Sequence, residues 1–486
     1  MMVTSSNLMQ RLLAACKAHP DAPALCSASR TLTYRALGNA IDDAARMLGR
    51  DAAGQRILLR VQRSPDDLAV LFFACLAAGA VPALADPVWS ERECRELAHR
   101  TGCTRWIGDE PWPGDARFDL PGATVLYAQS IDADPSLSAL DPKCGFIRYS
   151  SGSTGLPRAI AYSCDGALAI ADAWAEAARL TAADRILCLA TLNNGLAFNT
   201  TLLPGLLAGA ALRLESRFLT AKAVLAAARE HVPTIFIAFP LVYEFVAKRS
   251  VEEVRAAFHA SRLRLSSAAA LGSATKQAWH DVHGLPIGNY YGIAEVGPVT
   301  FNDGSDAESM GRPLADVRIQ TIDRGVSIVT PWMGLGYVRY SGDEDDAALS
   351  AGQPYVSSDR VATDVHGNIQ LLGRTDDVVN LNGKKVALSA VRAAVAPLVG
   401  GAEFAVIATY EEAGSYLCVH VEASPLSVAE IQAACARTLP PYVIPRRVVL
   451  HTHFPRSSAG KVLVGQLSST AVHPTLSMNQ TEGVTT

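Results

Sequence analysis

The stretch Tyr149–Ala159 reads YSSGSTGLPRA and has the composition of a loop that binds phosphate. Glycines allow a backbone to turn tightly and bring its N–H groups close to an anion. Hydroxyl side chains add hydrogen-bond donors, and Arg158 adds a planar positive group suited to phosphate. GxxxxGK[ST] is absent, so this is not a Walker loop. A flexible Ser/Gly linker is the alternative. The small residues of the loop are Ser150, Ser151, Gly152, Ser153, Thr154 and Gly155.

Further motifs follow this loop or precede it. They are LTYRAL from Leu32, NYYGIAE from Asn289, GRTDDVVNLNGKK from Gly373 and PRSSAGK from Pro455. In this order they resemble the adenylate-forming superfamily of acyl-CoA synthetases, peptide-synthetase adenylation domains and luciferases. The resemblance implies an α/β fold with a large N-terminal domain of parallel-rich sheets and a small, mobile α+β C-terminal domain. It also implies that Mg-ATP and a carboxylic acid react to give acyl-AMP and pyrophosphate.

The motif NYYGIAE takes its roles from this resemblance, which implies that Tyr291 stacks on adenine and that Glu295 binds magnesium. An aromatic face suits a purine, and one carboxylate suits a hard cation that keeps its waters. Ala294 stands where the family usually has Thr, so one hydrogen bond is missing or replaced by water. The small-residue strand end SSAAALG, from Ser266, resembles the segment along the adenine. The expected nucleotide contacts also include Ala269, Asn289, Tyr290 and Gly292.

The resemblance places the ribose contacts and the domain boundary further along the chain. Asp359, in YVSSD, lies 64 residues after Glu295 and 15 before Arg374. The resemblance implies that Asp359 accepts both ribose hydroxyls and that Arg374 contacts the ribose; an isolated Asp is otherwise a turn residue. The resemblance also implies that Asp376 is the hinge residue between the two domains. The expected domains are 1–375 and 376–467, followed by a polar, disordered tail at 468–486.

The resemblance implies that Lys461 bridges the substrate carboxylate and the α-phosphate. Glu295 and Thr154 are the other two expected catalytic residues. A flexible cation suits charge that develops on both groups. Arg158 keeps the charge of the usual loop lysine but changes its geometry. The sequence departs from the family pattern at Arg158 and also at Ala159, Ala294, Ser358 and Asn380. These departures motivate an alternative, a catalytically inactive nucleotide-binding scaffold.

The acid and the thiol follow less directly from the sequence. In the family the residues before the helix expected near Thr200 line the acyl pocket, to which we assign Asn194, Ala270 and Gly297. No acidic residue lies between Thr191 and Gly209, which argues against α-amino acids. Asn194 favours a hydroxylated aryl acid, although an Asn that caps a turn is an equal interpretation. A fatty or other small acid is the alternative. The thiol is that of CoA or of a carrier protein's phosphopantetheine.

Composition limits the class of protein. The 486 residues are 49% hydrophobic, enough for a large core, and the net charge of −4 does not indicate nucleic acid or an anionic membrane as partner. Ten scattered cysteines and the lack of an apolar leader favour a reducing cytoplasm. The apolar run Leu68–Ala85 could be a membrane span, but Gly79 and Pro82 favour a buried helix followed by a buried strand.

The apolar pattern predicts the elements that position these motifs. Two helices around a strand pair are expected in residues 5–50, with Thr33 as a helix cap. Strands at 185–190, 210–214, 234–238 and 263–269 alternate with helices at 221–230 and 251–259. This alternation predicts largely parallel sheets covered by helices. Residues 378–386 are expected to form a hairpin with Asn382-Gly383 at its turn.

Overall fold

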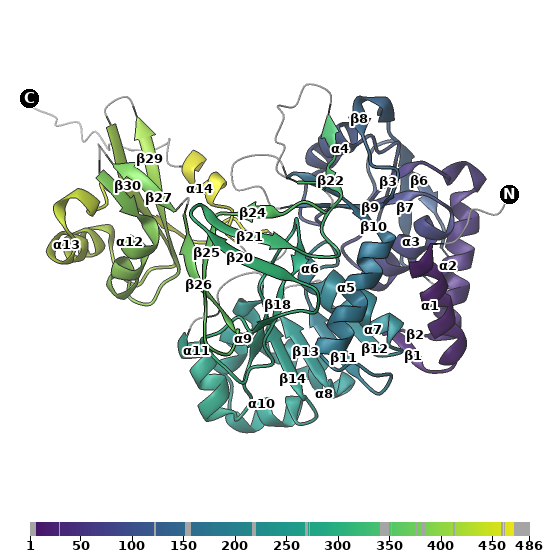
Figure 1. Cartoon of the computed structure of the whole chain (residues 1–486), viewed down its shortest axis with the longest axis horizontal. Coiled ribbons are helices and arrows are strands. Elements are labelled where there is room, and N and C mark those ends of the chain that lie inside the picture. Colours follow the sequence, from purple (N-terminus) through teal and green to yellow (C-terminus); the bar gives the residue numbers. More distant parts are fainter. Residues whose placement is uncertain are drawn as a thin grey trace, which may run out of the picture. The chain divides into compact units, whose positions relative to one another are not determined.

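The computed structural model describes residues 6–28, 30–120, 123–150, 157–215, 220–267, 271, 273–340, 349–350, 352–375, 377–381, 384–411, 414–457, 460 and 462–470 (Figure 1). The chain forms two compact units. Of the described residues, the first unit holds those up to Leu372 together with Ser457 and Gly460, and the second holds those from Gly373 to Arg456 and from Val462 onward.

A seven-stranded sheet forms half of the first unit. Its order is β15-β14-β13-β11-β12-β1-β2, and only the β1–β2 pair is antiparallel. The parallel part confirms the strands expected from the apolar runs. The bounds are β1 (Pro23–Cys26), β2 (Thr31–Thr33), β11 (Arg185–Leu189), β12 (Ala211–Leu214), β13 (Ile235–Ala238), β14 (Leu263–Ser266) and β15 (Gly288–Asn289).

An eight-stranded mixed sheet forms the other half, in the order β22-β10-β9-β4-β3-β5-β7-β6. Its centre, β9-β4-β3-β5, is parallel, and its flanks are antiparallel. The bounds are β3 (Arg56–Arg60), β4 (Val81–Leu84), β5 (Arg105–Gly108), β6 (Ala116–Phe118), β7 (Leu126–Ser130), β9 (Cys144–Tyr149), β10 (Ala159–Ser163) and β22 (Gly336–Tyr337).

Alternating side chains show how the layers are stacked. Ile186 and Cys188 enter one core, while Leu187 and Leu189 enter a second core on the opposite face of the seven-stranded sheet. The first core also receives alternate residues of the eight-stranded sheet, so it fills the space between the sheets. Its helices are α1 (Asn7–Ala18), α2 (Tyr34–Leu48), α3 (Pro65–Ala77), α5 (Cys164–Ala177) and α7 (Leu203–Leu207). The outer helices are α4 (Glu91–Thr101), α8 (Ala221–His231), α9 (Pro240–Ala247) and α10 (Val251–Phe258).

The N-terminal predictions are confirmed. Helices α1 and α2 flank the β1–β2 pair, and the Thr33 hydroxyl accepts a hydrogen bond from the Ala36 N–H as the cap of α2. The apolar run Leu68–Ala85 divides into the end of α3, a turn and β4. In the part of the chain that the structure describes, no helix has the length and apolar character needed to cross a membrane.

The helix expected near Thr200 begins earlier, so that prediction is wrong. Helix α6 (Gly195–Ala197) continues directly into a π-helical turn, Phe198–Leu202, and then into α7. Asn194 caps this helix, because its Oδ1 accepts a hydrogen bond of 2.8 Å from the Leu196 N–H. The apolar part of the stretch predicts a start near Thr200, whereas the cap lies six residues before it.

Short elements complete the first unit. Two-stranded pairs are β8–β23, β16–β17, β18–β19 and β25–β26, and β20-β21-β24 form a three-stranded sheet. Their bounds are β8 (Ser138–Ala139), β16 (Gly292–Ile293), β17 (Gly297–Pro298), β18 (Thr300–Phe301), β19 (Arg312–Pro313), β20 (Arg318–Ile322), β21 (Gly325–Val329), β23 (Arg339–Tyr340), β24 (Tyr355–Ser357), β25 (Asp359–Thr363) and β26 (Ile369–Arg374). Helix α11 (Ser273–Gln277) is followed by a π-helical turn, Ala278–Val282.

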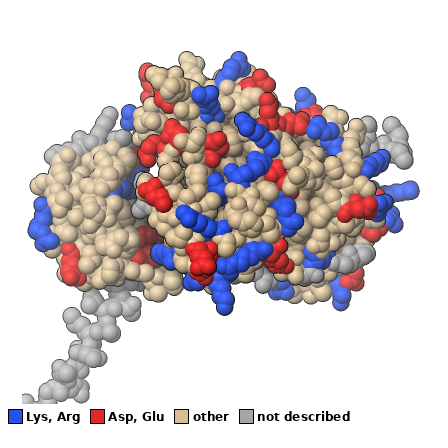
Figure 2. All heavy atoms as spheres, turned by 90° about the horizontal axis from the view of Figure 1, so that it is seen from below, with Lys and Arg blue, Asp and Glu red and all other residues tan. Residues whose placement is uncertain are grey.

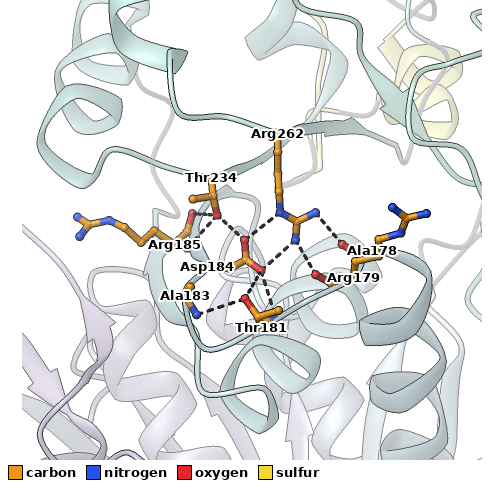
Figure 3. Close-up of polar contacts among 8 residues, drawn as sticks. All are labelled: Ala178, Arg179, Thr181, Ala183, Asp184, Arg185, Thr234 and Arg262. Atoms are coloured by element: carbon orange, nitrogen blue, oxygen red, sulfur yellow. Dashed lines mark hydrogen bonds and ion pairs between the residues drawn. The ribbon is translucent and has the colours of Figure 1, made fainter.

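A polar network joins the residues that precede three parallel strands (Figure 3). The Asp184 carboxylate accepts hydrogen bonds from Arg262 Nε (3.0 Å), Arg262 Nη2 (2.9 Å) and the Thr234 hydroxyl (2.7 Å). The same guanidinium donates to the carbonyls of Ala178 and Arg179 at the end of α5. This network holds the N-terminal edge of the seven-stranded sheet and leaves the C-terminal edge for other groups.

The second unit has its own apolar core, and its helices are α12 (Leu388–Val395), α13 (Val428–Thr438) and α14 (Val464–Thr470). Strands β27 (Val378–Leu381) and β28 (Lys384–Ala387) pair antiparallel, which confirms the strands of the predicted hairpin; its Asn382-Gly383 turn lies outside the described residues. Strands β29 (Phe404–Glu411), β30 (Gly414–Glu422) and β31 (Arg447–His451) form a sheet. Basic and acidic side chains both occur across the face of the molecule shown in Figure 2.

Candidate active site

The C-terminal edge of the seven-stranded sheet gathers segments that are far apart in the sequence. Strands β11, β14 and β15 are parallel, so the residues that follow them emerge at the same edge. Asn194 follows β11, Ser267 follows β14, and Tyr290 follows β15. The Ser267 hydroxyl donates a 3.1 Å hydrogen bond to the Tyr290 carbonyl, so two of these segments are in contact. The sheet therefore collects the predicted pocket and adenine segments in one place.

Tyr291 and Asp359, predicted to contact adenine and ribose, form a direct hydrogen bond. The Tyr291 hydroxyl donates to Asp359 Oδ2 over 2.6 Å, and the Ser357 hydroxyl donates to the same oxygen over 2.8 Å. Asp359 is the first residue of β25, which follows β24 after one residue. An aromatic ring beside an oriented carboxylate suits a nucleoside, because the two groups address its flat base and its hydroxyls.

Glu295 lies in the turn of the short hairpin β16–β17, in which Ile293 pairs with Gly297. Gly297 has φ of +72°, and a Cβ there would come within 2.8 Å of the Trp332 ring, so only glycine fits both the turn and its packing. Gly292 is similarly close, since its Cβ would lie 2.8 Å from the Gly297 carbonyl oxygen. The hairpin fixes the position of the Glu295 side chain, whose exposed fraction is 9%.

Two side chains lie beside the Glu295 carboxylate: Tyr337, on β22 of the eight-stranded sheet, and Arg158, the residue before β10. The Tyr337 hydroxyl, on β22, donates a 2.8 Å hydrogen bond to Oε1, and Arg158 Nη2 lies 3.9 Å from the same oxygen. The Arg158 guanidinium also stacks over the Tyr337 ring at 4.7 Å. Burial and the Glu295 charge raise the pKa of Tyr337, so its hydroxyl remains a donor. The structure thus brings Arg158, at the end of the predicted phosphate loop, to the predicted metal ligand.

Several predicted site residues lie outside the described residues: Ser151, Gly152, Ser153, Thr154, Gly155, Ala269, Ala270, Asp376 and Lys461. Of the phosphate loop, Ser150 is described, and its N–H donates a 2.8 Å hydrogen bond to the Arg158 carbonyl. Arg374 is the last residue of β26 and belongs to the second unit. The catalytic role of Lys461 and the hinge at Asp376 stay predictions.

Buried polar atoms without partners mark the sheet edge. Asn289 pairs its backbone with Asn302 in both directions, at 3.0 and 2.9 Å, but its buried Oδ1 accepts no hydrogen bond from the described residues. The Ser266 hydroxyl, in register with Asn289 on the adjacent strand, is also buried and has no partner within the residues that the structure describes. Tyr290 is buried, which raises the pKa of its hydroxyl to about 12. Buried polar atoms are normally paired, so this edge is suited to a polar ligand.

The sequence interpretation missed Tyr337, Ser357 and Arg148. Tyr337 lies 42 residues after Glu295, and no local motif marks it. Ser357 belongs to YVSSD, a stretch in which the resemblance gives a nucleotide contact to Asp359 alone. Arg148 carried a signal, because it is the one charged residue of the otherwise apolar strand β9, and it is buried beside Asn193 and Asn199.

Among the described residues no three His, Cys, Asp or Glu side chains gather in a way that could hold a metal ion. Glu295 nonetheless fits magnesium, because that ion usually binds through one or two carboxylates and completes its shell with water and phosphate. The carboxylate is oriented by Tyr337 and retains a second oxygen beyond the one that Tyr337 and Arg158 address. We therefore regard Glu295 as a suitable single protein ligand.

Comparisons with known proteins identify the family and the fold. The sequence profile of the family described as AMP-binding enzyme matches residues 12–343. Anthranilate–CoA ligase of Pseudomonas aeruginosa is 27% identical over 85% of this chain and 86% of that protein. The 3-hydroxybenzoate–CoA ligase of an Aromatoleum species is 24% identical over 91% of this chain and 92% of that protein. The crystal structure of the anthranilate CoA ligase AuaEII with anthranoyl-AMP superposes with a TM-score of 0.76, at 19% identity, over 96% of this chain and 98% of that one.

Proposed function

Because this chain belongs to the family of AMP-binding enzymes, we propose that it activates a carboxylic acid with ATP and passes the acyl group to a thiol. The acid's carboxylate attacks the α-phosphorus, a P–O bond to pyrophosphate breaks, and acyl-AMP forms. A thiolate then attacks the acyl carbon and releases AMP. The sulfur comes from CoA, or from the phosphopantetheine of a carrier protein.

One observation carries this proposal: the predicted nucleotide residues, scattered through the sequence, form two assembled pairs. Tyr291 and Asp359 meet at 2.6 Å, and Arg158 and Glu295 at 3.9 Å. The first pair has the groups needed to bind a base and its ribose. The second pair combines a cation suited to phosphate with a carboxylate suited to a divalent ion, which supports a site for a metal–phosphate group.

Magnesium, when bound, would neutralise charge on the phosphate oxygens. In this chain Glu295 would hold the ion, and Tyr337 would keep the carboxylate oriented through its 2.8 Å hydrogen bond. Arg158 supplies positive charge next to the same carboxylate and is suited to bind the outer phosphates. Lys461 is the residue that we assign, from the sequence, to stabilise charge at the α-phosphate during displacement.

A hydroxylated aryl acid is our preferred substrate, and small aliphatic acids are the alternative. Two relatives are named as CoA ligases of anthranilate and of 3-hydroxybenzoate, and these names support an aryl acid as the substrate. Asn194 is assigned to the acyl pocket and also caps a helix, because its Oδ1 accepts a hydrogen bond from the Leu196 N–H. The amide NH₂ would therefore be the group that meets a substrate oxygen.

ATP–pyrophosphate exchange tests the proposal. The intact protein is assayed with magnesium, without thiol, against aryl, fatty and amino acids. Exchange with an aryl acid is the expected result, and exchange with other acids alone would replace the substrate class. Tight ATP binding without exchange for any acid would overturn the enzymatic function and favour an inactive nucleotide binder.

Replacing the predicted catalytic lysine tests the same reaction at one residue. We expect Lys461→Ala to reduce exchange at least 100-fold while changing the Kd of ATP less than about 10-fold, because the charge acts mainly in the transition state. Lys143→Ala, at a lysine in the turn before β9, is the control and should leave exchange unchanged. An equal loss in the two variants would contradict the role of Lys461.

A further inference from the structure

Arg148 is a buried cation in the strand that leads into the predicted phosphate loop. It lies on β9, two residues before Ser150, and its exposed fraction is 7%. Among the described residues no carboxylate lies within ion-pair distance of its guanidinium, and burial lowers its pKa. A guanidinium without an anionic partner is costly to bury. This position therefore needs an explanation beyond packing.

The partners of the Arg148 guanidinium are neutral and distant. Nε and Nη2 donate to the Asn193 carbonyl at 3.4 and 3.3 Å, and Nη1 donates to Asn199 Oδ1 at 3.3 Å. These bonds are longer than the usual 2.9 Å between nitrogen and oxygen. A guanidinium has five N–H donors and three are engaged here, so donor capacity remains.

A second buried arginine, Arg264, shows how the hydrogen-bond donors of a guanidinium can be satisfied in this fold without a carboxylate. Arg264, on β14, also has no carboxylate partner among the described residues, and burial also lowers its pKa. Its Nε donates to the Pro286 carbonyl at 2.8 Å and its Nη1 to the Ser261 carbonyl at 2.5 Å. Backbone carbonyls at short distances thus satisfy Arg264, whereas the hydrogen bonds of the Arg148 guanidinium to described residues are 3.3 Å or longer.

The surroundings of Arg148 belong to the segment that we assign to the acyl pocket. A Cβ added to Gly195 would lie 3.3 Å from Arg148 Nη2, so the helix start leaves room for the guanidinium. The rings of Phe198 and Tyr162 lie 5.0 and 5.6 Å from its central carbon. Tyr162 in turn donates a 2.8 Å hydrogen bond to the carbonyl of Ala294, the residue before Glu295. Asn193 Oδ1 is buried there and has no hydrogen-bond partner in the described part of the chain.

From this arrangement we infer that Arg148 determines acid specificity by donating to an electron-rich oxygen substituent of the substrate, a ring hydroxyl or a second carboxylate. This inference rests on the proposed function, because it places the acid beside residues 193–199. A charged donor aimed at a substrate oxygen is worth more than a neutral one. An acid without that oxygen would add no partner to the long hydrogen bonds that the guanidinium makes with Asn193 and Asn199.

The test is ATP–pyrophosphate exchange with matched pairs of acids. Benzoate is compared with 3-hydroxybenzoate, 4-hydroxybenzoate and isophthalate, and pentanoate is compared with glutarate. The wild-type protein should prefer at least one substituted acid over its plain partner at least 10-fold in kcat/KM. The hydroxyl and carboxylate pairs separate the two sources of the oxygen.

Arg148→Met, which keeps length and removes charge and donors, should lower that preference at least 10-fold, through KM for the acid, with KM for ATP unchanged. Arg148→Lys should retain part of it. Arg264→Met is the matched control, expected to affect stability without moving the preference. If Arg148→Met fails to fold, the Arg148→Lys ratio and the wild-type preference still decide the outcome.

Different failures have different meanings. A wild-type protein that prefers plain acids, or an Arg148→Met variant that lowers exchange equally with all acids, would overturn the specificity role and leave a structural one. Absence of exchange with every acid would instead overturn the proposed function, and the inference with it.

Discussion

Glu295 is oriented by contacts within the protein. Its turn is set by two glycines, and Oε1 is engaged by the Tyr337 hydroxyl at 2.8 Å. A carboxylate fixed in advance needs little reorganisation when a cation arrives, which is the condition for strong electrostatic assistance. The orientation of the Glu295 carboxylate therefore depends on Tyr337, which lies outside the sequence motifs.

The first prediction separates charge from orientation at this site. We expect Glu295→Gln to reduce pyrophosphate exchange at least 100-fold and Tyr337→Phe to reduce it about 10-fold, because the amide loses the metal-binding charge while the Phe variant loses one charge-assisted hydrogen bond. Titrating exchange with magnesium checks this, since Tyr337→Phe should need more magnesium and recover. Equal, unrecoverable losses would show that Tyr337 has another role.

Among the elements, the parallel strands of the seven-stranded sheet are held at opposite ends by different chemistry. The N-terminal edge has the Asp184–Arg262–Thr234 network, and the C-terminal edge has the candidate site. Burial alone would raise the pKa of Asp184, but hydrogen bonds from Arg262, Thr234 and Thr181 outweigh it and the pKa is lowered. The network thus stabilises the ionised carboxylate and, through it, the frame of the site.

A stability prediction follows at this edge. Asp184→Asn should lower the free energy of unfolding by about 2 kcal/mol at pH 7, since the ionised partner of Arg262 is lost. Asp172→Asn, which breaks an exposed pair with Arg11, is the control and should cost less than about 1 kcal/mol.

The stabilisation by Asp184 should depend on pH in a defined direction. A depressed carboxyl pKa contributes stability above the unfolded value, near 4, and loses it as pH falls through the folded value. The difference in unfolding free energy between wild type and Asp184→Asn should therefore shrink below about pH 4. A difference that stays constant to pH 3 would contradict an ionised Asp184.

The sheet of the second unit contains a stacked histidine pair. His420 Nδ1 lies 2.9 Å from His451 Nε2, and Glu422 and His453 lie nearby. Burial, followed by the neighbouring His451, lowers the pKa of His420 to about 4, and burial lowers that of His451. Both rings are therefore neutral at pH 7, and one of them can donate to the other.

Acidification should destabilise the second unit in a defined window. Between pH 6.5 and 4 the unfolded chain binds more protons than the folded one, so stability falls as pH falls. We expect about 1–2 kcal/mol of loss from pH 7 to 5 from His420. Calorimetry of His420→Gln should show a weaker dependence, and His453→Gln, at an exposed histidine, should behave as wild type. Identical curves for wild type and His420→Gln would contradict a neutral, buried His420.

At the scale of the whole molecule, the two units have separate cores. The cores that include residues from Leu8 to Ile369 belong to the first unit, and the core from Leu381 to Val448 belongs to the second. Arg158, Tyr291, Glu295 and Asp359 are all in the first unit, whereas Arg374, the other predicted ribose contact, belongs to the second. All six tryptophans, from Trp89 to Trp332, precede Gly373, so their fluorescence reports on the first unit.

This division predicts a selective response to nucleotide. ATP with magnesium at about 100 times its Kd should stabilise the first unit by about 2.7 kcal/mol, seen as a higher midpoint in tryptophan fluorescence. Asp359→Asn should remove most of that shift, because the ribose contact is lost. Ser163→Ala, at the cap of α5, is the control: it should lower the midpoint but keep the shift. A shift retained in full by Asp359→Asn would place the nucleotide elsewhere.

The sequence by itself determined the strands, most helices and the residue types of the candidate site, because apolar periodicity and short motifs are local properties. Tertiary structure decided which residues meet. Tyr337 reaches Glu295, and Arg148 lies against the 193–199 segment, only because strands distant in sequence are neighbours in the eight-stranded sheet or face the same core. The helix after Asn194 began earlier than predicted for a related reason: tertiary packing buries Asn199, Thr200 and Thr201 within a π-helical turn, where local preference alone suggests a helix start.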